Sequence, residues 1–544
     1  MSFNFATLWE TVADTVPTQM AVVCGPRRVS WHDYENRAAR LAAAFSAAGL
    51  GPHSKVGLYL YNGAEYCETN FAALKLRGIP INVNYRYLDE ELVYLFDNAD
   101  LEAVVFHTSL ADRIARVAPK CPGLKLLVAV DDGPTANGAV EVAGAIAYED
   151  LLGRHDALPR VAPQGDEIYM LYTGGTTGMP KGVMYPLGEF TEFFVLGYPP
   201  MIGLEPPADA AALMATVGER AGNGAPPLVA MSAPPLMHGT GCWLGMMAPH
   251  MMGGTAVLLE SRGLNAVELW DTVARERVQH LVIVGDAFAR PLLDALNADP
   301  GRWDLSSLRL MISSGAMFST PIKQGLIDHV PELTVADLLG STEGGMGSSI
   351  MNRNTPAAET ARFALSPTTK VFTEDGREVQ PGSGEVGLVA SGGLVPIAYY
   401  KDPEKSARTF RVFAGHRYSI PGDMARVAAD GTLELLGRGS NCINTGGEKV
   451  FPEEVEEALK KHPAVQDALV FGLPDERFGN RVSAVASLRA GASAAAEDIL
   501  AHVHQHLAGY KVPRGLHLVA QVPRAPNGKA DYPTARALFE AAAG

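Results

Sequence analysis

The residues whose types point most clearly to a binding or catalytic role form one short stretch near the end of the first third of the chain. From Tyr172 to Val183 the sequence reads Tyr-Thr-Gly-Gly-Thr-Thr-Gly-Met-Pro-Lys-Gly-Val. Glycines let backbone N–H groups approach an anion, threonine hydroxyls add donors, and a lysine adds positive charge. This combination predicts a loop that holds the phosphates of a nucleotide. The residues expected to bind them are Thr173, Gly174, Gly175, Thr176, Thr177, Gly178 and Lys181.

The flanks of this stretch favour a phosphate loop over a solvated turn. Glu167 to Thr173 is apolar and aromatic, which predicts a buried strand that ends where the glycines begin. Nucleotides bind at such strand ends in open α/β sheets. The stretch is not a Walker A loop, because that loop needs Gly before its lysine and Ser or Thr after it, whereas Pro180 and Gly182 stand here. The sequence therefore argues against a P-loop nucleotide hydrolase.

With the motifs described below, this stretch resembles the adenylate-forming acyl-CoA synthetases, whose superfamily includes luciferases and the adenylation domains of peptide synthetases. The resemblance covers essentially the whole chain and is strongest to fatty-acyl-CoA synthetases. It implies that the loop from Thr173 to Lys181 closes over the β- and γ-phosphates of ATP while a carboxylate attacks the α-phosphate. It also implies that the protein uses ATP, Mg²⁺ and coenzyme A.

A second motif, Gly340-Ser-Thr-Glu-Gly344, follows a β-like run from Leu333 to Leu338. It places a hydroxyl beside a carboxylate in a glycine-flanked turn, which is the pair that a magnesium-ATP site needs. An isolated Thr-Glu pair is more often a helix start or a solvated turn. The resemblance implies that Glu343 ligates Mg²⁺ and that Thr342 donates to the α-phosphate as charge builds there.

The resemblance assigns further residues to the nucleotide. Leu339 stands where relatives carry an aromatic residue that packs on adenine, so nucleotide affinity or base selectivity is expected to be weaker. Asp423 and Arg438 match a ribose-binding pair, although their spacing alone also fits a surface ion pair worth about 1 kcal/mol or less. The other expected cofactor-binding residues are Gly315, Ala316, Met317, Asp337 and Gly340.

Lys529 lies in a Pro/Gly-rich loop, Pro523 to Asp531, where most lysines would simply be solvated. By resemblance it is the catalytic lysine that bridges the attacking carboxylate and the α-phosphate. It would stabilise charge that develops in the transition state.

His238 lies in an apolar segment punctuated by glycine, where a lone histidine more often packs in a core. The resemblance places it beside the acyl pocket, so we expect it to position the substrate rather than to act as a base. The segments Met231–Met247 and Gly285–Leu293 are rich in Met, Leu, Ala and Phe. They predict a pocket for a medium-chain, long-chain or bulky carboxylic acid, polycyclic acids included.

Two segments near the C-terminus are candidates for binding coenzyme A. By resemblance, Gly446 and Gly447 line a tunnel for its pantetheine arm, and Ser440 is the pivot of a rotating C-terminal domain. Lys511 and Arg514 could meet the phosphates of coenzyme A, or Lys511 could simply complement a helix dipole, and both interpretations stay open.

A chain of 544 residues is too long for one core, and we expect an N-terminal ATP- and acyl-binding domain at 1–439 and a mobile C-terminal domain at 440–544. The net charge of −15 disfavours nucleic acid as a partner. Five scattered cysteines indicate neither disulfides nor a zinc site, and no signal peptide or membrane helix is evident. We expect a cytoplasmic monomer or homodimer, with peripheral membrane contact left open.

Strand-like runs alternate with helix-like ones, which predicts an α/β fold with mostly parallel sheets in the large domain and a small α+β domain after it. Glu205 to Pro227, rich in Pro, Ala and Gly, is predicted to be a loop over the surface. The predicted strands include 55–61, 103–107, 124–130, 255–259 and 280–284, with helices at 64–77 and 450–460.

Two other functions compete with an acyl-CoA synthetase. An adenylating enzyme could pass its acyl group to a carrier protein or an amine, but no carrier domain is evident after Lys529. A non-catalytic nucleotide sensor could share the fold. Two departures from the family keep that alternative open: Leu339 replaces an aromatic residue, and Ser440 stands where relatives usually carry Asp or Lys. The joint presence of Lys181, Glu343 and Lys529 favours a working enzyme.

Overall fold

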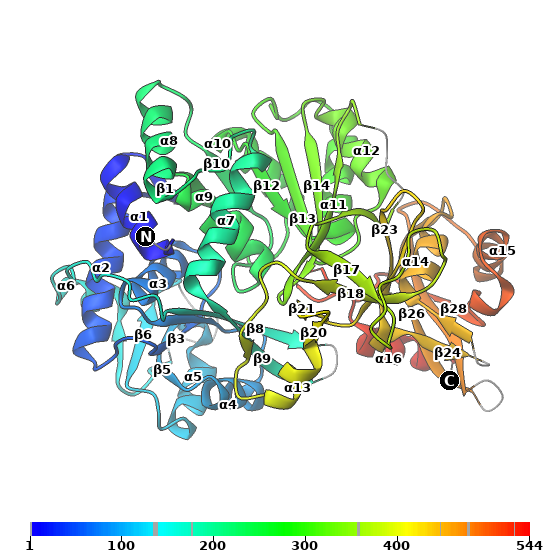
Figure 1. The fold of residues 1–544 in the computed structure, drawn as a ribbon, viewed down its shortest axis with the longest axis horizontal. Helices are drawn as coiled ribbons and strands as arrows, with labels where there is room; N and C mark the ends of the chain where they lie inside the picture. The colour runs from blue at the N-terminus through cyan, green and yellow to red at the C-terminus, as the bar shows by residue number, and fades with distance from the viewer. Residues whose placement is uncertain are drawn as a thin grey trace.

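The computed structural model describes residues 3–133, 140–175, 178–355, 360–445, 448–475, 479–526 and 528–543. Figure 1 shows a large N-terminal part and a smaller C-terminal domain, drawn in orange and red at the right. The predicted α/β fold with a small α+β domain after it is confirmed. The boundary predicted between residues 439 and 440 falls within the short turn η4 (Gly439–Asn441) and stays a prediction.

Two sheets of the large domain are built from strand–helix–strand units. One has the order β4-β3-β5-β6-β7 and the other contains the run β1-β11-β10-β12-β13-β14, with every pairing in these runs parallel. Their strands are mostly buried and rich in Val, Ile and Leu, as expected where helices cover both faces. The predicted strands are confirmed with small shifts at their ends: β3 (Lys55–Tyr59), β5 (Leu101–His107), β6 (Leu126–Val130), β11 (Thr255–Leu258) and β12 (His280–Ile283). The others are β1 (Met20–Cys24), β4 (Ile79–Asn82), β7 (Ala145–Ala147), β10 (Val229–Ser232), β13 (Leu310–Ser314) and β14 (Thr334–Ser341).

Beyond β14 the second sheet continues with antiparallel strands, which the pattern of alternating strands and helices did not indicate. The order runs β14-β15-β16-β23-β22-β18, and it brings β22 and β23 together so that Asp423 pairs with Arg438. These strands are β15 (Gly344–Met351), β16 (Arg362–Leu365), β18 (Gly387–Ser391), β22 (Asp423–Val427) and β23 (Leu433–Arg438).

A small antiparallel sheet of order β19-β9-β8 carries the glycine-rich stretch. Its strands are β8 (Ile168–Gly175), β9 (Gly178–Pro186) and β19 (Ala398–Tyr399). The glycines therefore lie at the tip of a β-hairpin. The comparison with open α/β sheets had suggested the edge of a parallel sheet instead.

The C-terminal domain contains a sheet of order β25-β24-β27-β26, with β28 paired to β27. The predicted helix at 450–460 is confirmed as α14, and the predicted strand at Ala468–Phe471 is the centre of β26. Its elements are β24 (Ile443–Thr445), β25 (Glu448–Val450), α14 (Pro452–Lys460), β26 (Val465–Asp475), β27 (Gly479–Leu488), α15 (Ala496–His506), β28 (Gly515–Leu518) and α16 (Tyr532–Ala543).

The segment Glu205 to Pro227, predicted to be a loop, is mainly a helix, α8 (Ala210–Gly222). Asp209 caps it by accepting a hydrogen bond from the N–H of Ala212 at 2.8 Å. Its apolar side packs towards α1 (Phe5–Thr15), because Leu213 and Val217 are buried. The prediction was wrong because the prolines occur only at the flanks, whereas the helix itself is rich in Ala, Leu and Met, which favour a helix and outweigh Gly218.

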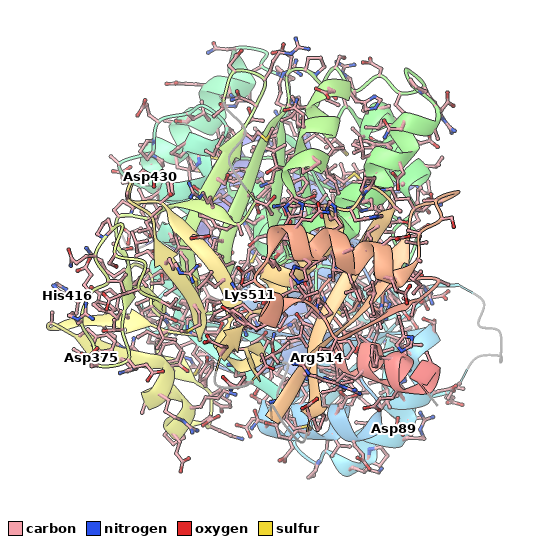
Figure 2. The ribbon with its side chains drawn as sticks, turned by 90° about the vertical axis from the view of Figure 1, so that its right-hand side faces the viewer. Asp89, Asp375, His416, Asp430, Lys511 and Arg514 are labelled. Atoms are coloured by element: carbon pink, nitrogen blue, oxygen red, sulfur yellow. The ribbon has the colours of Figure 1, made fainter. Side chains whose placement is uncertain are left out.

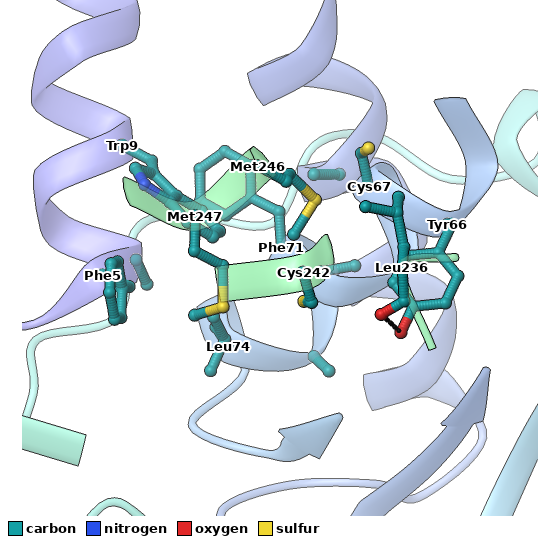
Figure 3. Packing of buried hydrophobic residues seen from close by; sticks show 14 of the residues in the cluster. Phe5, Trp9, Tyr66, Cys67, Phe71, Leu74, Leu236, Cys242, Met246 and Met247 are labelled. Atoms are coloured by element: carbon teal, nitrogen blue, oxygen red, sulfur yellow. Dashed lines mark hydrogen bonds between the residues drawn. The ribbon is translucent and has the colours of Figure 1, made fainter. Parts of the chain in front are cut away.

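A large hydrophobic core supports the π-helix η3 (Thr240–Met247). Figure 3 shows Cys242, Met246 and Met247 of this helix packed in that core. Two glycines allow the helix to pack closely on neighbouring backbone, because a Cβ on Gly241 would lie 2.6 Å from the carbonyl oxygen of Pro235 and one on Gly245 would lie 2.5 Å from Cβ of Ser232.

Candidate active site

A cavity of about 910 Å³ is lined by residues of both domains. The N-terminal domain contributes the β8 end, α7 (Leu187–Met201), η3 and the β14–β15 hairpin, and the C-terminal domain contributes residues around Phe471 and Lys529. Eight of the residues predicted to bind the nucleotide or the acid line this cavity together: Thr173, Gly174, His238, Gly315, Leu339, Gly340, Thr342 and Lys529.

The β8–β9 hairpin carries the predicted phosphate loop. Thr173 stands opposite Lys181 in the hairpin, and Gly175 stands opposite Gly178 at its tip. Thr176 and Thr177 lie outside the described residues. Asn82, at the end of β4, fixes the base of the hairpin, because its amide nitrogen donates to the carbonyl of Tyr172 at 2.8 Å and its amide oxygen accepts from the N–H of Tyr172 at 2.7 Å.

Asn82 is a site residue that no sequence motif revealed. The same amide nitrogen donates to the carbonyl of Met237 at 2.7 Å, and Asn82 lines the cavity. It therefore ties the phosphate hairpin to the segment that carries His238. A buried asparagine directly after an apolar strand is the only sequence signal that could have pointed to it.

Thr342 and Glu343 occupy the turn between β14 and β15, where Ser341 pairs with Gly344. The hydroxyl of Tyr185 donates to the carbonyl of Thr342 at 2.8 Å and fixes the turn from the side of β9. Gly344 adopts φ +156°, and a Cβ there would lie 2.9 Å from Oγ of Ser391, so glycine is required at this point.

Lys181 and Glu343 form a buried ion pair next to the cavity, with 3.1 Å between Nζ and Oε1. Tyr399 contacts both groups: its hydroxyl donates to Oε1 of Glu343 at 2.8 Å, and Nζ of Lys181 lies 3.9 Å from its ring centroid. Burial alone would raise the pKa of Glu343, but Lys181 and Tyr399 hold it below its ordinary value. Burial lowers the pKa of Lys181, an effect that Glu343 partly offsets. The ion pair thus favours the charged form of each group.

Asp423 and Arg438 stand side by side on β22 and β23, with 3.5 Å between Oδ1 and Nε. Burial raises the pKa of Asp423, and Arg438 counteracts part of that effect. The pKa of Lys529 is affected by the charges of three groups: Arg438, Glu343 and Asp423. These four side chains therefore lie close together. A carboxylate beside a guanidinium at this point can bind the hydroxyls of a ribose.

Lys529 projects from the C-terminal domain into the cavity. Its backbone is held by a tight turn in which the N–H of Ala525 donates to the carbonyl of Lys529 at 2.8 Å. Desolvation, reinforced by Arg438, lowers the pKa of its ammonium group, while Glu343 and Asp423 act in the opposite direction. A lysine at this point of the cavity wall can stabilise negative charge that develops in the cavity.

His238 lines the cavity as a neutral imidazole. Desolvation, followed by the charges of Lys529 and Arg86, lowers its pKa to about 3. Within the described part of the chain its Nε2 is buried and has no hydrogen-bond partner. A neutral ring with an unpaired nitrogen can accept or donate a hydrogen bond to a substrate, depending on its tautomer.

Several predicted nucleotide-binding residues are not part of the cavity wall. Asp337 is buried in an ion pair with Lys323, 2.6 Å between oxygen and nitrogen, and burial raises its pKa to about 6 although Lys323 counteracts this. Ala316 and Met317 turn their carbonyls towards Gly285, and that of Met317 accepts from the N–H of Asp286 at 2.9 Å. Gly446 and Gly447 lie outside the described residues. The segment Gly285–Leu293, predicted to border the acid, does not line the cavity either.

A second cavity has a volume of about 590 Å³. Arg86 lines the second cavity and its chain neighbour Tyr87 lines the first. Four arginines and Asp112 line the second cavity, although the whole chain carries a net charge of −15, and two of these arginines are paired: Arg116 with Asp89 and Arg262 with Asp132. Its other arginines come from distant parts of the sequence, which is why no local motif revealed them: Arg113, Arg116 and Arg262.

Neither Lys511 nor Arg514 lines either cavity. Nζ of Lys511 contacts both oxygens of Glu454 at 2.6 and 2.7 Å. Both residues belong to the C-terminal domain, on the side that Figure 2 turns towards the viewer. In this domain arrangement Lys511 therefore serves an ion pair.

Among the described residues, no helix is long and apolar enough to cross a bilayer. In the same residues, no group of three or more His, Cys, Asp or Glu side chains could hold a metal ion.

Comparisons with known proteins agree with the cavity's chemistry. The family model described as "AMP-binding enzyme" matches residues 9–396, and the one described as "AMP-binding enzyme C-terminal domain" matches residues 454–529. The chain is 42% identical to a 3-oxocholest-4-en-26-oate–CoA ligase from Rhodococcus rhodochrous, over 98% of this chain and 95% of the relative. It is 41% identical to a medium/long-chain-fatty-acid–CoA/3-oxocholest-4-en-26-oate–CoA ligase from Mycobacterium marinum, over 99% of this chain and 97% of the relative.

The fold is also found among solved structures. A benzoate CoA ligase from Burkholderia xenovorans superposes with a TM-score of 0.81 at 21% identity, covering 98% of this chain and 99% of that one. This likeness shows the fold alone. The two family models and the two curated relatives, taken together, show that the chain belongs to the AMP-binding enzymes, the adenylate-forming superfamily that its motifs predicted.

Proposed function

We propose that this AMP-forming acid–CoA ligase activates a hydrophobic carboxylic acid as an acyl-adenylate and then transfers the acyl group to coenzyme A. One observation carries the proposal. Lys529, Thr342 and His238 line the same cavity as a wall of apolar and aromatic side chains. Charge stabilisation and a site for an apolar acid are thus combined in one space.

The charged groups fit the first half-reaction. Thr173, Gly174 and Lys181 would hold the departing pyrophosphate, and Thr342 would donate to the α-phosphate. Lys529 would lie between that phosphate and the attacking carboxylate and stabilise the charge that builds there. Bond formation between the acid and the α-phosphorus then releases pyrophosphate.

Glu343 fits a magnesium ion that arrives with ATP. It offers a buried, ionised carboxylate, and Mg²⁺ commonly uses one or two carboxylates together with substrate phosphates. When bound, the ion would neutralise charge on the phosphates. The neighbouring Lys181 would share this task.

The apolar wall supports a medium-chain, long-chain or polycyclic acid. It is formed by Phe193 and Phe194 of α7, Trp243 and Leu244 of η3, and Leu338 of β14. No lysine or arginine belongs to these elements of the wall, so a second carboxylate would find no partner there. The two curated relatives are named for acids of this kind.

The second cavity supports the binding of coenzyme A. Coenzyme A carries several phosphate charges, and four arginines line the second cavity, of which Arg116 and Arg262 would exchange their aspartate partners for phosphate: Arg86, Arg113, Arg116 and Arg262. Arg86 lies close enough to lower the pKa of His238, so a thiol arm entering from this side would pass near the acyl group. The predicted glycines Gly446 and Gly447 remain candidates for the same path.

A panel of acids tests the proposal. Purified enzyme is assayed for acid-dependent ATP–pyrophosphate exchange and for AMP release with coenzyme A. Exchange and thioester formation with decanoate, palmitate or a steroid side-chain acid, at rates above those with acetate, amino acids or dicarboxylates, are expected. Absence of exchange would indicate a nucleotide sensor, and exchange without use of coenzyme A would indicate another acceptor.

A further inference from the structure

Tyr399 connects the phosphate-loop lysine to the glutamate of the proposed metal site, and no motif pointed to it. Both of its contacts involve charged groups: the hydroxyl donates to Oε1 of Glu343 at 2.8 Å, and Nζ of Lys181 lies 3.9 Å from the ring centroid. Nζ of Lys181 lies 3.1 Å from the same oxygen of Glu343. One side chain thus contacts both groups at once.

The position of Tyr399 is itself tightly fixed. Strand β19 pairs with β9, which places Tyr399 opposite Val183, two residues beyond Lys181. Its N–H donates to Oγ of Ser406 at 2.9 Å, and its ring packs against Phe410 with 5.1 Å between centroids. The residue is 2% exposed. A side chain locked by packing in this way can orient the flexible groups that touch it.

Lys181 and Glu343, the two groups that Tyr399 contacts, both need such orientation. Lysine has a flexible four-carbon stem, and its ammonium group can turn in several directions. Nζ of Lys181 already lies 3.1 Å from Oε1 of Glu343, so the contacts with Tyr399 limit the remaining directions in which the two groups can turn. The hydroxyl of Tyr399 occupies one side of Oε1, and the face of the ring gives Lys181 a second attractive surface.

We propose that Tyr399 is a positioning residue for the adenylation step, whose hydroxyl orients Glu343 for the metal and whose ring holds Lys181 beside the phosphates. This inference rests on the function proposed above. It predicts that the two parts of one side chain have separable effects on substrate binding.

Two variants separate these effects. Tyr399→Phe removes the hydroxyl and keeps the ring, so the Mg²⁺ concentration for half-maximal ATP–pyrophosphate exchange should rise about 10-fold, as expected for losing a hydrogen bond to a charged group. Calorimetry should show weaker binding of Mg-ATP and unchanged binding of ATP in EDTA. Tyr399→Leu removes both parts, so binding of ATP in EDTA should also weaken, by about 5-fold. Thioester formation from added acyl-adenylate should keep its rate in both variants.

Tyr400→Phe is a matched control. The hydroxyl of Tyr400 also donates to a carboxylate, Oδ2 of Asp100 at 2.6 Å, but the residue does not line the cavity. This variant should match the unmodified enzyme in every measurement.

Three outcomes are decisive. An unchanged Mg²⁺ dependence in Tyr399→Phe overturns the inference. A parallel loss of Mg-ATP binding, metal-free ATP binding, thioester formation and thermal stability also overturns it, since that pattern indicates a structural role only. If the unmodified enzyme shows no acid-dependent exchange, the proposed function itself fails, and the two failures are thereby distinguished.

Discussion

Lys529 and Gly315 meet across the boundary between the two domains: a Cβ on Gly315 would lie 3.8 Å from Cε of Lys529. Gly315 follows β13 of the large domain and has φ +95°, whereas Lys529 belongs to the C-terminal domain. The reaction cavity therefore depends on how the domains are arranged, and the contact explains why each half-reaction can be tested separately.

Replacing Lys529 by alanine should slow ATP–pyrophosphate exchange about 10²- to 10³-fold, because the cavity loses the cation that stabilises developing charge. Thioester formation from added acyl-adenylate should stay near the original rate, since the phosphate chemistry is then complete. Lys461→Ala, an exposed lysine of the same domain, is the control and should leave both rates unchanged. Equal losses in the two half-reactions would contradict the assigned role.

Replacing Trp243 by alanine should shift the acid preference towards bulkier substrates. The indole N–H donates to the hydroxyl of Tyr169 at 2.8 Å, and the ring packs edge-on against Phe190, so this part of the wall is rigid. Its removal should raise kcat/KM for a polycyclic acid relative to decanoate by about 10-fold, consistent with the 1–3 kcal/mol that small shape changes in such pockets are worth. Competition assays measure the ratio. Trp303→Ala, outside the cavity, should leave it unchanged.

Replacing Arg86 by alanine should raise the KM for coenzyme A about 10-fold, because a charge-assisted contact to phosphate is lost. ATP–pyrophosphate exchange should keep its rate, since coenzyme A does not take part in it. Steady-state kinetics with varied coenzyme A provide the measurement. Arg353→Ala, an exposed arginine away from both cavities, serves for comparison, and an equal effect there would argue against the second cavity as the binding site.

Glu453, in the first turn of α14, should make stability depend on pH. Burial, followed by its neighbour Glu456, raises the pKa of Glu453, and its carboxylate packs against Gly437. The folded state thus keeps a proton that the unfolded chain releases, and the free energy of unfolding falls as pH rises from about 4.5 to the raised pKa.

Glu453→Gln should remove this fall in the free energy of unfolding with rising pH. The variant should match the parent at pH 4 and exceed it at pH 8 by about 1–3 kcal/mol, the usual cost of a buried polar group without full compensation. Chemical denaturation at both pH values measures the difference. Glu497→Gln, also in a helix first turn but exposed, should show no such divergence. A constant gap at all pH values would contradict the role of the carboxyl group.

Local patterns predicted much of the fold, because buried strands such as β3 and β12 are runs of apolar residues that are visible in the sequence. They missed α8, whose flanking prolines suggested a loop. They also did not show that the phosphate stretch is a hairpin, although β8 and β9 are neighbours in the sequence. The pairing of β9 with β19 joins residues more than 200 positions apart and is not visible in any local pattern.

The site residues also divide into those that the sequence predicted and those that it did not. Thr342, Glu343 and Lys529 could be assigned because each lies in a short motif. Asn82 and Tyr399 could not, because their importance lies in what they touch after folding: two carbonyls in one case, and a lysine and a glutamate in the other.

In the proposed reaction, the shared cavity would also set the order of events. A rotation of the C-terminal domain would carry Lys529 and Phe471 out of the wall in a single movement. Departure of the catalytic cation would expose the newly formed mixed anhydride to the thiol, while the hairpin groups on the other domain stay in place. One motion would thus end the first reaction and admit the second nucleophile. No second conformational change would then be needed for the thiol to enter.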